Sequence, residues 1–415
     1  MPHAGGDGPG DELAAGGTAA GTEPGGACSE SLALETEWVE VSRELSFTWH
    51  RPPLETVEQQ WRDPGTVRIF LNGCFDLMHV GHFNALRQAK SLFFRKGYRR
   101  VVLVAGIHSD AAIAGQKGPP LMSNEERLAV LRATKWVDEL ATELPYVSMS
   151  ASMADALRVH FICHGDDLPV CRGGGGMYTE AMEAGRFQLV KRTEGISTTH
   201  ILERLLRGGE VGAGAAAAGA LGATLATTQR LADFAAPAEP QRPRRLLAEA
   251  QRVVYVRGSF DLLHGGHVAL LEHAAQLGDY LLVGLLSDEA ARRRRGAAPV
   301  LTLPERAMAV LSLRAVDDVV LGAPEDVGSE LLAALNVALV ATGQRPGEAG
   351  EARDDGLALP RSLGILRELE RAGPLTSQGL RQRFLSRSAE FTERNAGLLE
   401  KELAYVRAKS YVPEA

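Results

Sequence analysis

The chain has 415 residues, of which 45% are hydrophobic and 23% charged, and its formal net charge is −7 at pH 7. This is the balance of a globular protein with room for two or three domains, and the acidic charge disfavours nucleic-acid binding. No apolar run reaches the roughly 20 residues that span a bilayer, and the N-terminus lacks the apolar core of a secretory signal. We therefore expect a cytosolic protein without a transmembrane segment, with at most peripheral contact to endoplasmic reticulum membranes.

The N-terminal part of the chain gives little structural signal. Residues 1–35 are a low-complexity stretch rich in Gly and Ala, and we predict a disordered extension. Residues 36–66 have mixed apolar character and no clear assignment. From Val67, short β-rich runs alternate with amphipathic helical spacing up to residue 207, which predicts one α/β domain. Ser123 and Glu126 have the spacing of a capping box at the start of one of its helices.

The same alternation returns later in the chain. A Gly-, Ala- and Pro-rich stretch at 208–250 is predicted to be a linker, with a transient helix in its Ala-rich part as the alternative, and a second α/β domain is predicted over 251–385. The remaining residues, 386–415, are predicted to be helical. Strands joined by helices of this length require right-handed crossovers and a parallel sheet. The predicted fold class is therefore α/β, with two tandem doubly wound parallel-sheet domains of Rossmann-like type.

One motif occurs in both domains. GCFDLMHVGH at 73–82 and GSFDLLHGGH at 258–267 agree at seven of ten positions, and their histidines are 185 residues apart in both cases. The motif follows the first strand of its domain and leads into a helix. In a doubly wound sheet, ligands bind at this place, and a helix N-terminus favours phosphate.

The two histidines of the motif are the main candidates for chemistry. His79 and His82 are three residues apart, so one helical turn aims both imidazoles at the same bound group. Gly81 allows a ligand to approach the backbone. For Asp76, holding the turn through backbone N–H groups is an equal alternative to a role in binding. Zinc binding by the histidines lacks a third ligand at a recognisable spacing.

The four cysteines point to no disulfide framework. Cys28, Cys74, Cys163 and Cys171 are irregularly spaced, which favours a reducing compartment. Cys163, His164 and Cys171 form a poor zinc pattern without a fourth ligand, and burial as small apolar residues is the alternative.

Three segments resemble one superfamily. GCFDLMHVGH resembles the H-x-G-H motif of the nucleotidyltransferases that include the cytidylyltransferases. KRTEGISTTHILERLL at 191–206 resembles the R-T-x-G-I-S-T segment of cytidylyltransferases that act on phosphocholine, phosphoethanolamine or glycerol 3-phosphate. QKGPPLMSNEERLAVLRATKWVDEL at 116–140 resembles their K-G-x-P segment with its following helix.

The resemblance implies roles for individual residues. It implies His79, His82 and Lys117 as catalytic residues that stabilise the phosphates in the transition state. It further implies nucleotide binding by the remaining motif positions, Gly73, Phe75, Gly81, Arg192, Thr193, Gly195, Ile196, Ser197 and Thr198. Mg²⁺ is implied by CTP chemistry, with no protein ligand assigned.

The tandem arrangement resembles the ethanolamine-phosphate cytidylyltransferases, because the choline enzymes have one unit followed by a long membrane-binding helical region. It implies transfer of CMP from CTP to phosphoethanolamine, giving CDP-ethanolamine and pyrophosphate for phosphatidylethanolamine synthesis. Phosphocholine as the substrate, or a CTP-sensing pseudoenzyme or scaffold, are the alternatives. A homodimer is an open possibility.

Substrate recognition has its own candidates. Tyr146 stands where the choline enzymes typically have Trp, and Val170 where they have Tyr. A quaternary ammonium is favoured by a full aromatic cage, whereas a primary ammonium donates hydrogen bonds to carboxylates. We therefore predict substrate binding by Tyr146, Asp166 and Asp167, with Asp166 favoured and a plain loop turn as the alternative for the Asp pair.

The second domain departs from the first. His264 and His267 persist, but Arg295 stands in the place of Lys117 and no R-T-x-G-I-S-T segment occurs. The nearest equivalent, ERAGPLTSQGLRQRF at 370–384, keeps only a helix start at Thr376. We predict that the first domain catalyses, and that the second either binds nucleotide weakly or serves as a packing and regulatory partner.

Overall fold

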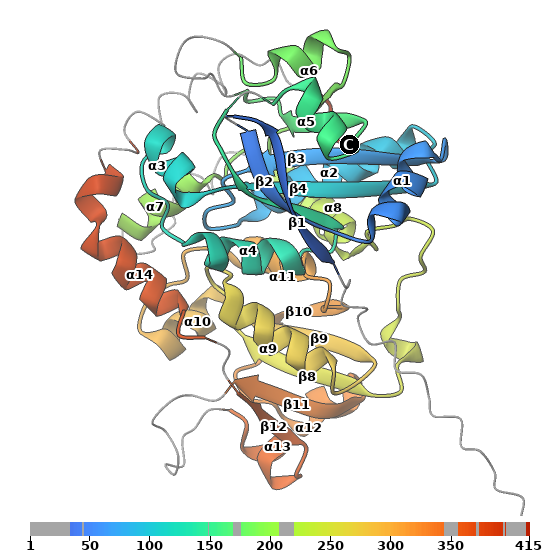
Figure 1. Cartoon of the computed structure of the whole chain (residues 1–415). Helices are drawn as coiled ribbons and strands as arrows, with labels where there is room; N and C mark the ends of the chain where they lie inside the picture. The colour runs from blue at the N-terminus through green and yellow to red at the C-terminus, as the bar shows by residue number, and fades with distance from the viewer. Residues whose placement is uncertain are drawn as a thin grey trace, which may run out of the picture.

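The protein forms two α/β units, which lie one above the other in Figure 1. The computed structural model describes residues 34–43, 45–147, 149–168, 176–206, 220–343, 356–370, 373–392, 395 and 412–415. Several positions discussed above lie outside the described residues: Cys28, Val170, Cys171, most of the N-terminal extension and residues 396–411.

The first unit is built on a sheet of seven strands in the order β1-β2-β5-β4-β3-β6-β7. The five strands from β5 to β7 in this order pair in parallel, and the β1–β2 hairpin joins β5 in antiparallel fashion. The strands are β1 (Glu35–Ser42), β2 (Leu45–Arg51), β3 (Thr66–Gly73), β4 (Arg100–His108), β5 (Glu139–Leu144), β6 (Phe161–Gly165) and β7 (Phe187–Val190). The unassigned segment 36–66 therefore extends the sheet at one edge.

Helices follow the strands as the alternating pattern requires. Ser109 and Ser123 cap two of them through side-chain oxygens that accept backbone N–H groups, and the capping box of Ser123 with Glu126 is present. The helices of this unit are α1 (Leu54–Arg62), α2 (Val80–Arg95), α3 (Asp110–Lys117), α4 (Asn124–Ala133), α5 (Ala151–Ala156), α6 (Thr179–Glu183) and α7 (Thr198–Leu206).

The second unit repeats this plan with a wholly parallel sheet. Its order β10-β9-β8-β11-β12 matches β5-β4-β3-β6-β7 strand for strand. The strands are β8 (Val253–Gly258), β9 (Tyr280–Leu286), β10 (Asp318–Ala323), β11 (Val337–Gly343) and β12 (Leu366–Leu369). The helices are α9 (Gly265–Ala275), α10 (Asp288–Arg295), α11 (Leu303–Leu311), α12 (Ser329–Ala334), α13 (Ala358–Ser362) and α14 (Ser377–Ser386). The prediction of two tandem doubly wound units is confirmed.

Part of the predicted linker is folded. Helix α8 (Ala220–Ala235) and the short 3-10 turn η1 (Leu247–Glu249) lie within it. Phe234 is fully buried and meets Trp136 edge-on at a centroid distance of 5.3 Å, while Lys135 donates to the Ala236 carbonyl at 2.9 Å. The Ala-rich composition that suggested a loose linker instead supplies a helix, because its apolar end finds a core to pack against.

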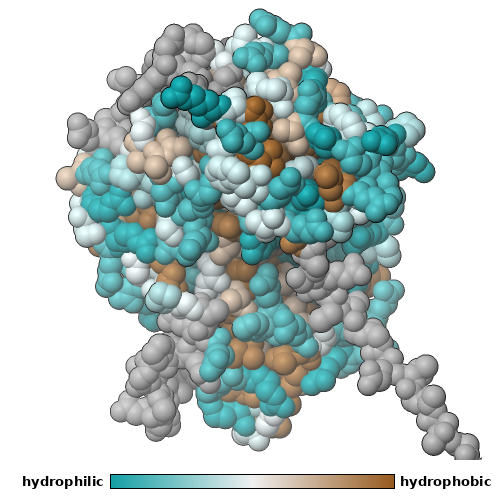
Figure 2. Space-filling model, in the orientation of Figure 1, coloured by the Kyte–Doolittle hydropathy of each residue, from teal (hydrophilic) through white to brown (hydrophobic). Residues whose placement is uncertain are grey.

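The two units share one hydrophobic core and face each other with equivalent contacts. The Lys135 N–H donates to the Ser312 carbonyl, and the Arg314 N–H donates to the Ala133 carbonyl, both at 2.9 Å. These mirrored contacts relate the units by an approximate two-fold axis between α4 and α11 (Figure 1). On the face shown in Figure 2, hydrophilic residues predominate and hydrophobic ones form small separate patches. Among the described helices, none has the length and apolarity needed to cross a membrane.

Candidate active site

The H-x-G-H turn lies at the topological switch point of the sheet, where the strand order reverses. β3 has β4 on one side and β6 on the other, so a crevice forms beyond its carboxyl end. Phe75 and Leu77 in this turn have left-handed backbone angles, with φ of 51° and 48°. Such angles are costly for bulky side chains and are typical of functional sites. The equivalent residues of the second unit, Phe260 and Leu262, adopt the same angles.

His79 is fixed by the helix that it begins. It is the N-cap of α2, and its Nδ1 accepts the Gly81 N–H at 3.0 Å. A neutral His79 therefore carries its proton on Nε2, available to a ligand. A Cβ on Gly81 would lie 2.8 Å from Cε1 of His79, so the imidazole itself requires glycine here. Gly73 is restricted in the same way, since a Cβ would lie 3.3 Å from the Phe75 ring.

His82 lies against His79, with ring centroids 4.0 Å apart. His79 is buried and His82 half-buried, and burial lowers the pKa of His79 well below its usual value and that of His82 to about 4. Within the described part of the chain, Nδ1 of His82 has no hydrogen-bond partner. Two neutral imidazoles with free hydrogen-bonding capacity thus meet at the start of α2.

Two cationic side chains act on these histidines. After burial, the charges of Lys117 and Arg192 are the next causes of the lowered pKa of His82. The charge of Arg192 also lowers the pKa of His79, after burial and the neighbouring His82. The predicted catalytic and phosphate-binding groups therefore converge on one electropositive place, which suits a polyanion such as a triphosphate.

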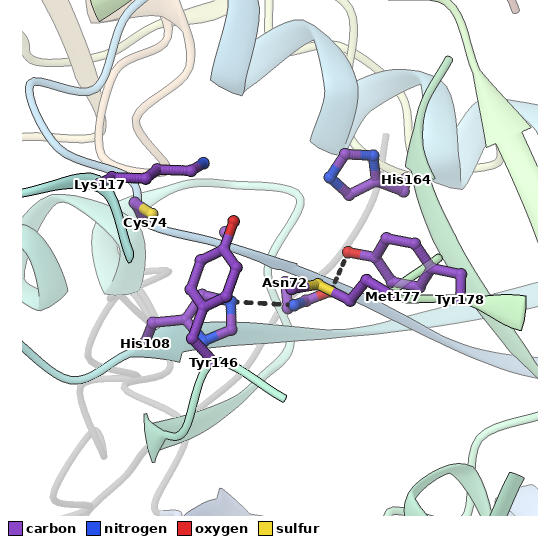
Figure 3. Close-up of a pocket in the computed structure, with 9 residues that line it drawn as sticks. Asn72, Cys74, His108, Lys117, Tyr146, His164, Met177 and Tyr178 are labelled. Atoms are coloured by element: carbon purple, nitrogen blue, oxygen red, sulfur yellow. Dashed lines mark hydrogen bonds between the residues drawn. The ribbon is translucent and has the colours of Figure 1, made fainter. Parts of the chain in front are cut away.

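A small pocket adjoins this place (Figure 3). The Nζ of Lys117 lies 5.5 Å from the centroid of the Tyr146 ring, within cation–π range. The pKa of Lys117 is raised, chiefly by the Cys74 sulfur and further by Tyr146 and Asp167. The pocket is lined by Asn72, Gly73, Cys74, His108, Lys117, Tyr146, His164, Met177 and Tyr178.

A chain of hydrogen bonds forms one wall of the pocket. The Tyr178 hydroxyl donates to Oδ1 of Asn72 at 3.0 Å, and Asn72 Nδ2 lies 3.1 Å from Nε2 of His108 (Figure 3). Since the amide nitrogen donates, Nδ1 of His108 carries the proton and donates to the Pro145 carbonyl at 3.0 Å. Burial lowers the pKa of His108 to about 4, so it stays neutral.

Most of these lining residues were not predicted from the sequence. Asn72 and His108 stand at the carboxyl ends of β3 and β4, two neighbouring parallel strands. Polar residues at that edge were the available signal, because parallel strands deliver their last residues to one crevice. Tyr178 and Met177 carried no such signal, since the fold brings them in from a separate helix start.

Asp76 holds the loop that follows Lys117. Its carboxylate is 3% exposed and accepts the N–H groups of Leu121 and Met122 at 2.9 and 3.0 Å. These contacts favour the turn-holding alternative for Asp76 over direct contact with substrate.

The R-T-x-G-I-S-T segment closes over the turn. Thr198 Oγ1 donates to the Asp76 carbonyl at 3.0 Å, and Ser197 Oγ accepts the His200 N–H at 3.1 Å. Gly195 has a φ of 79°, which favours glycine. The Ile196 carbonyl oxygen packs close to Gly81, where an added Cβ would lie 3.6 Å from it. The segment therefore shapes the backbone around the histidines more than it exposes side chains.

Thr193 and Arg192 have different surroundings. Thr193 is 5% exposed and its Oγ1 accepts Asn84 Nδ2 at 3.0 Å, so this hydroxyl anchors the segment to α2. Nε of Arg192 lies 3.2 Å from Oδ2 of Asp167, at the surface of the site.

Asp166 and Asp167 have different hydrogen-bond partners. Asp166 accepts the Arg192 N–H at 2.9 Å and the Val412 N–H at 3.2 Å, so both of its oxygens bind backbone. Asp167 pairs with the Arg192 side chain and contributes to the raised pKa of Lys117. This geometry favours Asp167, rather than Asp166, as the carboxylate that faces a ligand.

The last described residues contact the same region. Glu414 Oε1 accepts Asn84 Nδ2 at 2.9 Å, and the Ala415 N–H donates to Gln88 Oε1 at 3.3 Å. Gln88 in turn donates to the Lys191 carbonyl at 2.9 Å. Residues 412–415 therefore brace the helix that carries the histidines, a contact over 300 residues of sequence that no local pattern indicates.

The second unit reproduces the turn. His264 Nδ1 accepts the Gly266 N–H at 3.1 Å, and the rings of His264 and His267 are 3.9 Å apart. Arg295 ends α10 as Lys117 ends α3, and it lies 3.9 Å from Asp261. Thr376 caps α14 by accepting the Gly379 N–H at 2.7 Å.

The described residues were also compared with the side-chain clusters that bind metal ions. Across the described ranges, no group of three or more His, Cys, Asp and Glu side chains is placed to hold an ion. Cys163 is buried in the core, where burial raises the pKa of its thiol to about 12.

Comparison with known proteins decides the family. The cytidylyltransferase-like family model matches residues 70–204 and 255–354, one stretch in each unit. The ethanolamine-phosphate cytidylyltransferase of Dictyostelium discoideum is 34% identical over 362 residues, covering 82% of this chain and 96% of the relative. This chain belongs to the ethanolamine-phosphate cytidylyltransferase family. The resemblance predicted from the motifs is confirmed.

Other relatives agree with this assignment. The Arabidopsis thaliana ethanolamine-phosphate cytidylyltransferase is 33% identical, with 83% of this chain and 86% of the relative covered. Human choline-phosphate cytidylyltransferase A is 33% identical over 173 residues, but the match covers only 41% of this chain and 45% of the relative. The match to the choline-phosphate relative thus covers less than half of this chain, whereas the matches to the two ethanolamine-phosphate relatives cover more than four fifths of it.

Proposed function

We propose that this chain transfers CMP from CTP to phosphoethanolamine, forming CDP-ethanolamine and pyrophosphate. A phosphate oxygen of phosphoethanolamine attacks the α-phosphorus of CTP, and the bond from that phosphorus to the oxygen that bridges to the β-phosphate breaks. The observation that carries the proposal is the convergence of the two imidazoles with Lys117 and Arg192 beside a pocket. The chain's relatives over most of its length are ethanolamine-phosphate cytidylyltransferases. Catalysis is then mostly positioning and charge stabilisation.

The residue roles follow from the contacts. His79 donates from Nε2 to the triphosphate, because its Nδ1 is occupied by the Gly81 N–H. His82 stabilises the charge that develops on the α-phosphate, and its unpartnered Nδ1 gives it that capacity. Lys117 lies between the histidines and the pocket, where it neutralises both substrates' phosphates.

Substrate selection depends on the acidic side of the site. Arg192 and Asp167 pair with each other at 3.2 Å. We propose that CTP phosphates take over Arg192, which frees the Asp167 carboxylate to accept hydrogen bonds from the primary ammonium of phosphoethanolamine. Phosphocholine, whose ammonium has no hydrogen to donate, gains less from this carboxylate.

Mg²⁺ enters this proposal as part of the CTP substrate. Its preferred ligands are carboxylate, phosphate and water oxygens. The carboxylate nearest the turn, Asp76, is occupied by two backbone N–H groups, so the triphosphate itself fits better as the main ligand. When bound, the ion neutralises phosphate charge. A cytosolic location with peripheral membrane contact, and a homodimer, stay predictions.

The deciding experiment is a side-by-side assay of the full chain with CTP, Mg²⁺ and either phosphoethanolamine or phosphocholine. We expect CDP-ethanolamine as the main product, with kcat/KM for phosphoethanolamine at least about tenfold higher, since unpaired polar groups discriminate strongly. An equal or higher value for phosphocholine would establish the choline alternative. CTP binding without any product would establish the sensing pseudoenzyme.

A further inference from the structure

Helix α14 of the second unit grips the loop that follows Lys117. Arg383 donates from Nη1 to the Leu121 carbonyl at 2.9 Å. Its guanidinium also forms a bidentate ion pair with the Glu126 carboxylate, at 2.6 and 2.9 Å. One turn further on, Arg387 Nη1 donates to the Pro120 carbonyl at 3.1 Å. In Figure 1, α14 lies beside α7 of the first unit, and the loop that it holds follows α3, which ends at Lys117.

The same loop is held from its other side by the first unit. Asp76 accepts the Leu121 N–H at 2.9 Å, while Arg383 binds the carbonyl of the same residue. Between Lys117 and this anchored peptide lie only Gly118, with a φ of 80°, and two prolines. The prolines stiffen the connection, so the place where Leu121 is held sets where the Lys117 backbone can be.

We propose that α14 positions Lys117 for catalysis, and that Arg383 is the main positioning residue. The proposal rests on the proposed function, in which Lys117 neutralises the substrates' phosphates. A lysine is a point charge on a flexible stem, so its usefulness depends on a well-placed starting point. The second unit then supports catalysis in the first unit by positioning Lys117, and it need not catalyse a reaction itself.

An equivalent clamp runs in the opposite direction and supplies a matched control. Arg204 of α7 pairs with Glu305 at 2.7 and 3.0 Å and donates to the Val300 carbonyl at 3.3 Å. Glu126 and Glu305 each complete a capping box and each bind an arginine of the other unit. They differ only in the loop that their arginine holds.

The first test compares Glu126→Ala with Glu305→Ala in the full chain. Both variants lose one capping-box carboxylate and one ion pair between the units, so similar changes in Tm are expected. We expect kcat/KM to fall about tenfold for Glu126→Ala, because small displacements of a reacting group are costly, and by less than about twofold for Glu305→Ala. Equal losses in the two variants would overturn the proposal.

The second test asks whether Arg383 acts through Lys117. Arg383→Met should lower kcat about tenfold in the wild-type background and by less than about twofold in a Lys117→Ala background, since coupled residues are not additive. Arg383→Lys should restore part of the loss. The same factor in both backgrounds would mean a general structural role and would overturn the proposal.

A calorimetric titration with CTP separates this proposal from the proposed function. Lys117 contacts nucleotide phosphates in our account, so Arg383→Met should weaken CTP binding severalfold, and unchanged binding would count against the clamp. If the wild-type chain binds CTP but makes no CDP-ethanolamine, the proposed acceptor is wrong. The CTP affinity of Arg383→Met then still tests whether α14 positions Lys117. A wild-type chain that does not bind CTP would overturn both.

Discussion

The two units share the frame of a nucleotide site and differ in the pocket beside it. In both, a histidine caps the first helix through the N–H of a glycine, at 3.0 Å in one and 3.1 Å in the other, and the second histidine stacks on it. In both, a buried aspartate accepts two N–H groups of the following loop. The frame is thus maintained in detail by the same side-chain chemistry.

Gly73 is kept as Gly258, but the polar and aromatic pocket residues that can be compared are replaced in the second unit. We matched positions of the two units by their strand ends, helix caps and a shared proline. The equivalent residues at four pocket positions are chemically different: Asn72 and Arg257, His108 and Leu286, Tyr146 and Glu325, and Tyr178 and Leu357. The hydrogen-bonded wall next to Lys117 therefore has no counterpart. The turn that we propose to bind phosphates and the pocket that we propose to bind the acceptor are therefore separable parts of this fold.

The sharpest way to break the comparison is to remove one histidine from each unit. His82→Ala should lower kcat by a hundred- to thousand-fold, or about 3–4 kcal/mol, because a transition-state donor is lost. His267→Ala should lower it less than about tenfold, through packing alone. Steady-state kinetics of the two purified variants measure both values. Comparable losses would mean that the second unit also takes part in the reaction.

Acid stability sharpens the contrast at the pocket. The pKa of His108 is lowered from 6.5 to about 4, so the unfolded chain binds this proton first and the free energy of unfolding falls as pH drops through that window. One such group accounts for about 3 kcal/mol over the full window. His108→Leu, which introduces the residue found at Leu286 of the second unit, should make the free energy of unfolding depend less on pH. Urea unfolding at pH 7 and pH 5 measures it, and an unchanged slope would contradict the assignment.

The basic residues at the ends of α3 and α10 offer a third contrast. Lys117→Ala should lower kcat/KM about thirtyfold, roughly 2 kcal/mol, because a charged hydrogen bond to phosphate is lost. Arg295→Ala removes a side chain that is 37% exposed and lies 3.9 Å from Asp261, and we expect a change of less than about threefold. Kinetics with both substrates varied in turn test this, and a large effect of Arg295→Ala would argue for two working sites.

The smallest expected effect concerns the C-terminal residues, which contact the first unit's helix α2. Glu414→Ala removes the carboxylate that Asn84 and Arg230 bind, so the support behind Thr193 weakens. We expect KM for CTP to rise by about fivefold or less, with kcat nearly unchanged. Glu239→Ala, which removes the carboxylate of a surface ion pair with Arg242 at 2.8 Å, serves as a control and should leave KM for CTP as in wild type.

The motifs predicted the family and much of the site. His79 and His82 were named from their spacing, and Lys117 and Arg192 from the resemblance of their segments to the family. The structure brings their charges and rings together. The roles of Asp166 and Thr193 were harder to predict, because the partners that occupy them, Val412 and Asn84, lie far away in sequence. Composition indicated at most a transient helix over 220–235, whereas the structure has a helix there, because a helix in an Ala-rich stretch becomes stable only when it packs against a core.

By itself, the sequence determined the alternation of strands and helices, the duplication and the reactive motif, because these depend on local periodicity and on residues adjacent in the chain. Only the tertiary structure decided which carboxylates are occupied by backbone N–H groups, how the pocket wall is hydrogen-bonded, and that a helix of one unit holds the lysine loop of the other. Those properties arise between residues far apart in the chain, and a hydrogen bond or an ion pair forms only where the fold brings the two partners within about 3 Å.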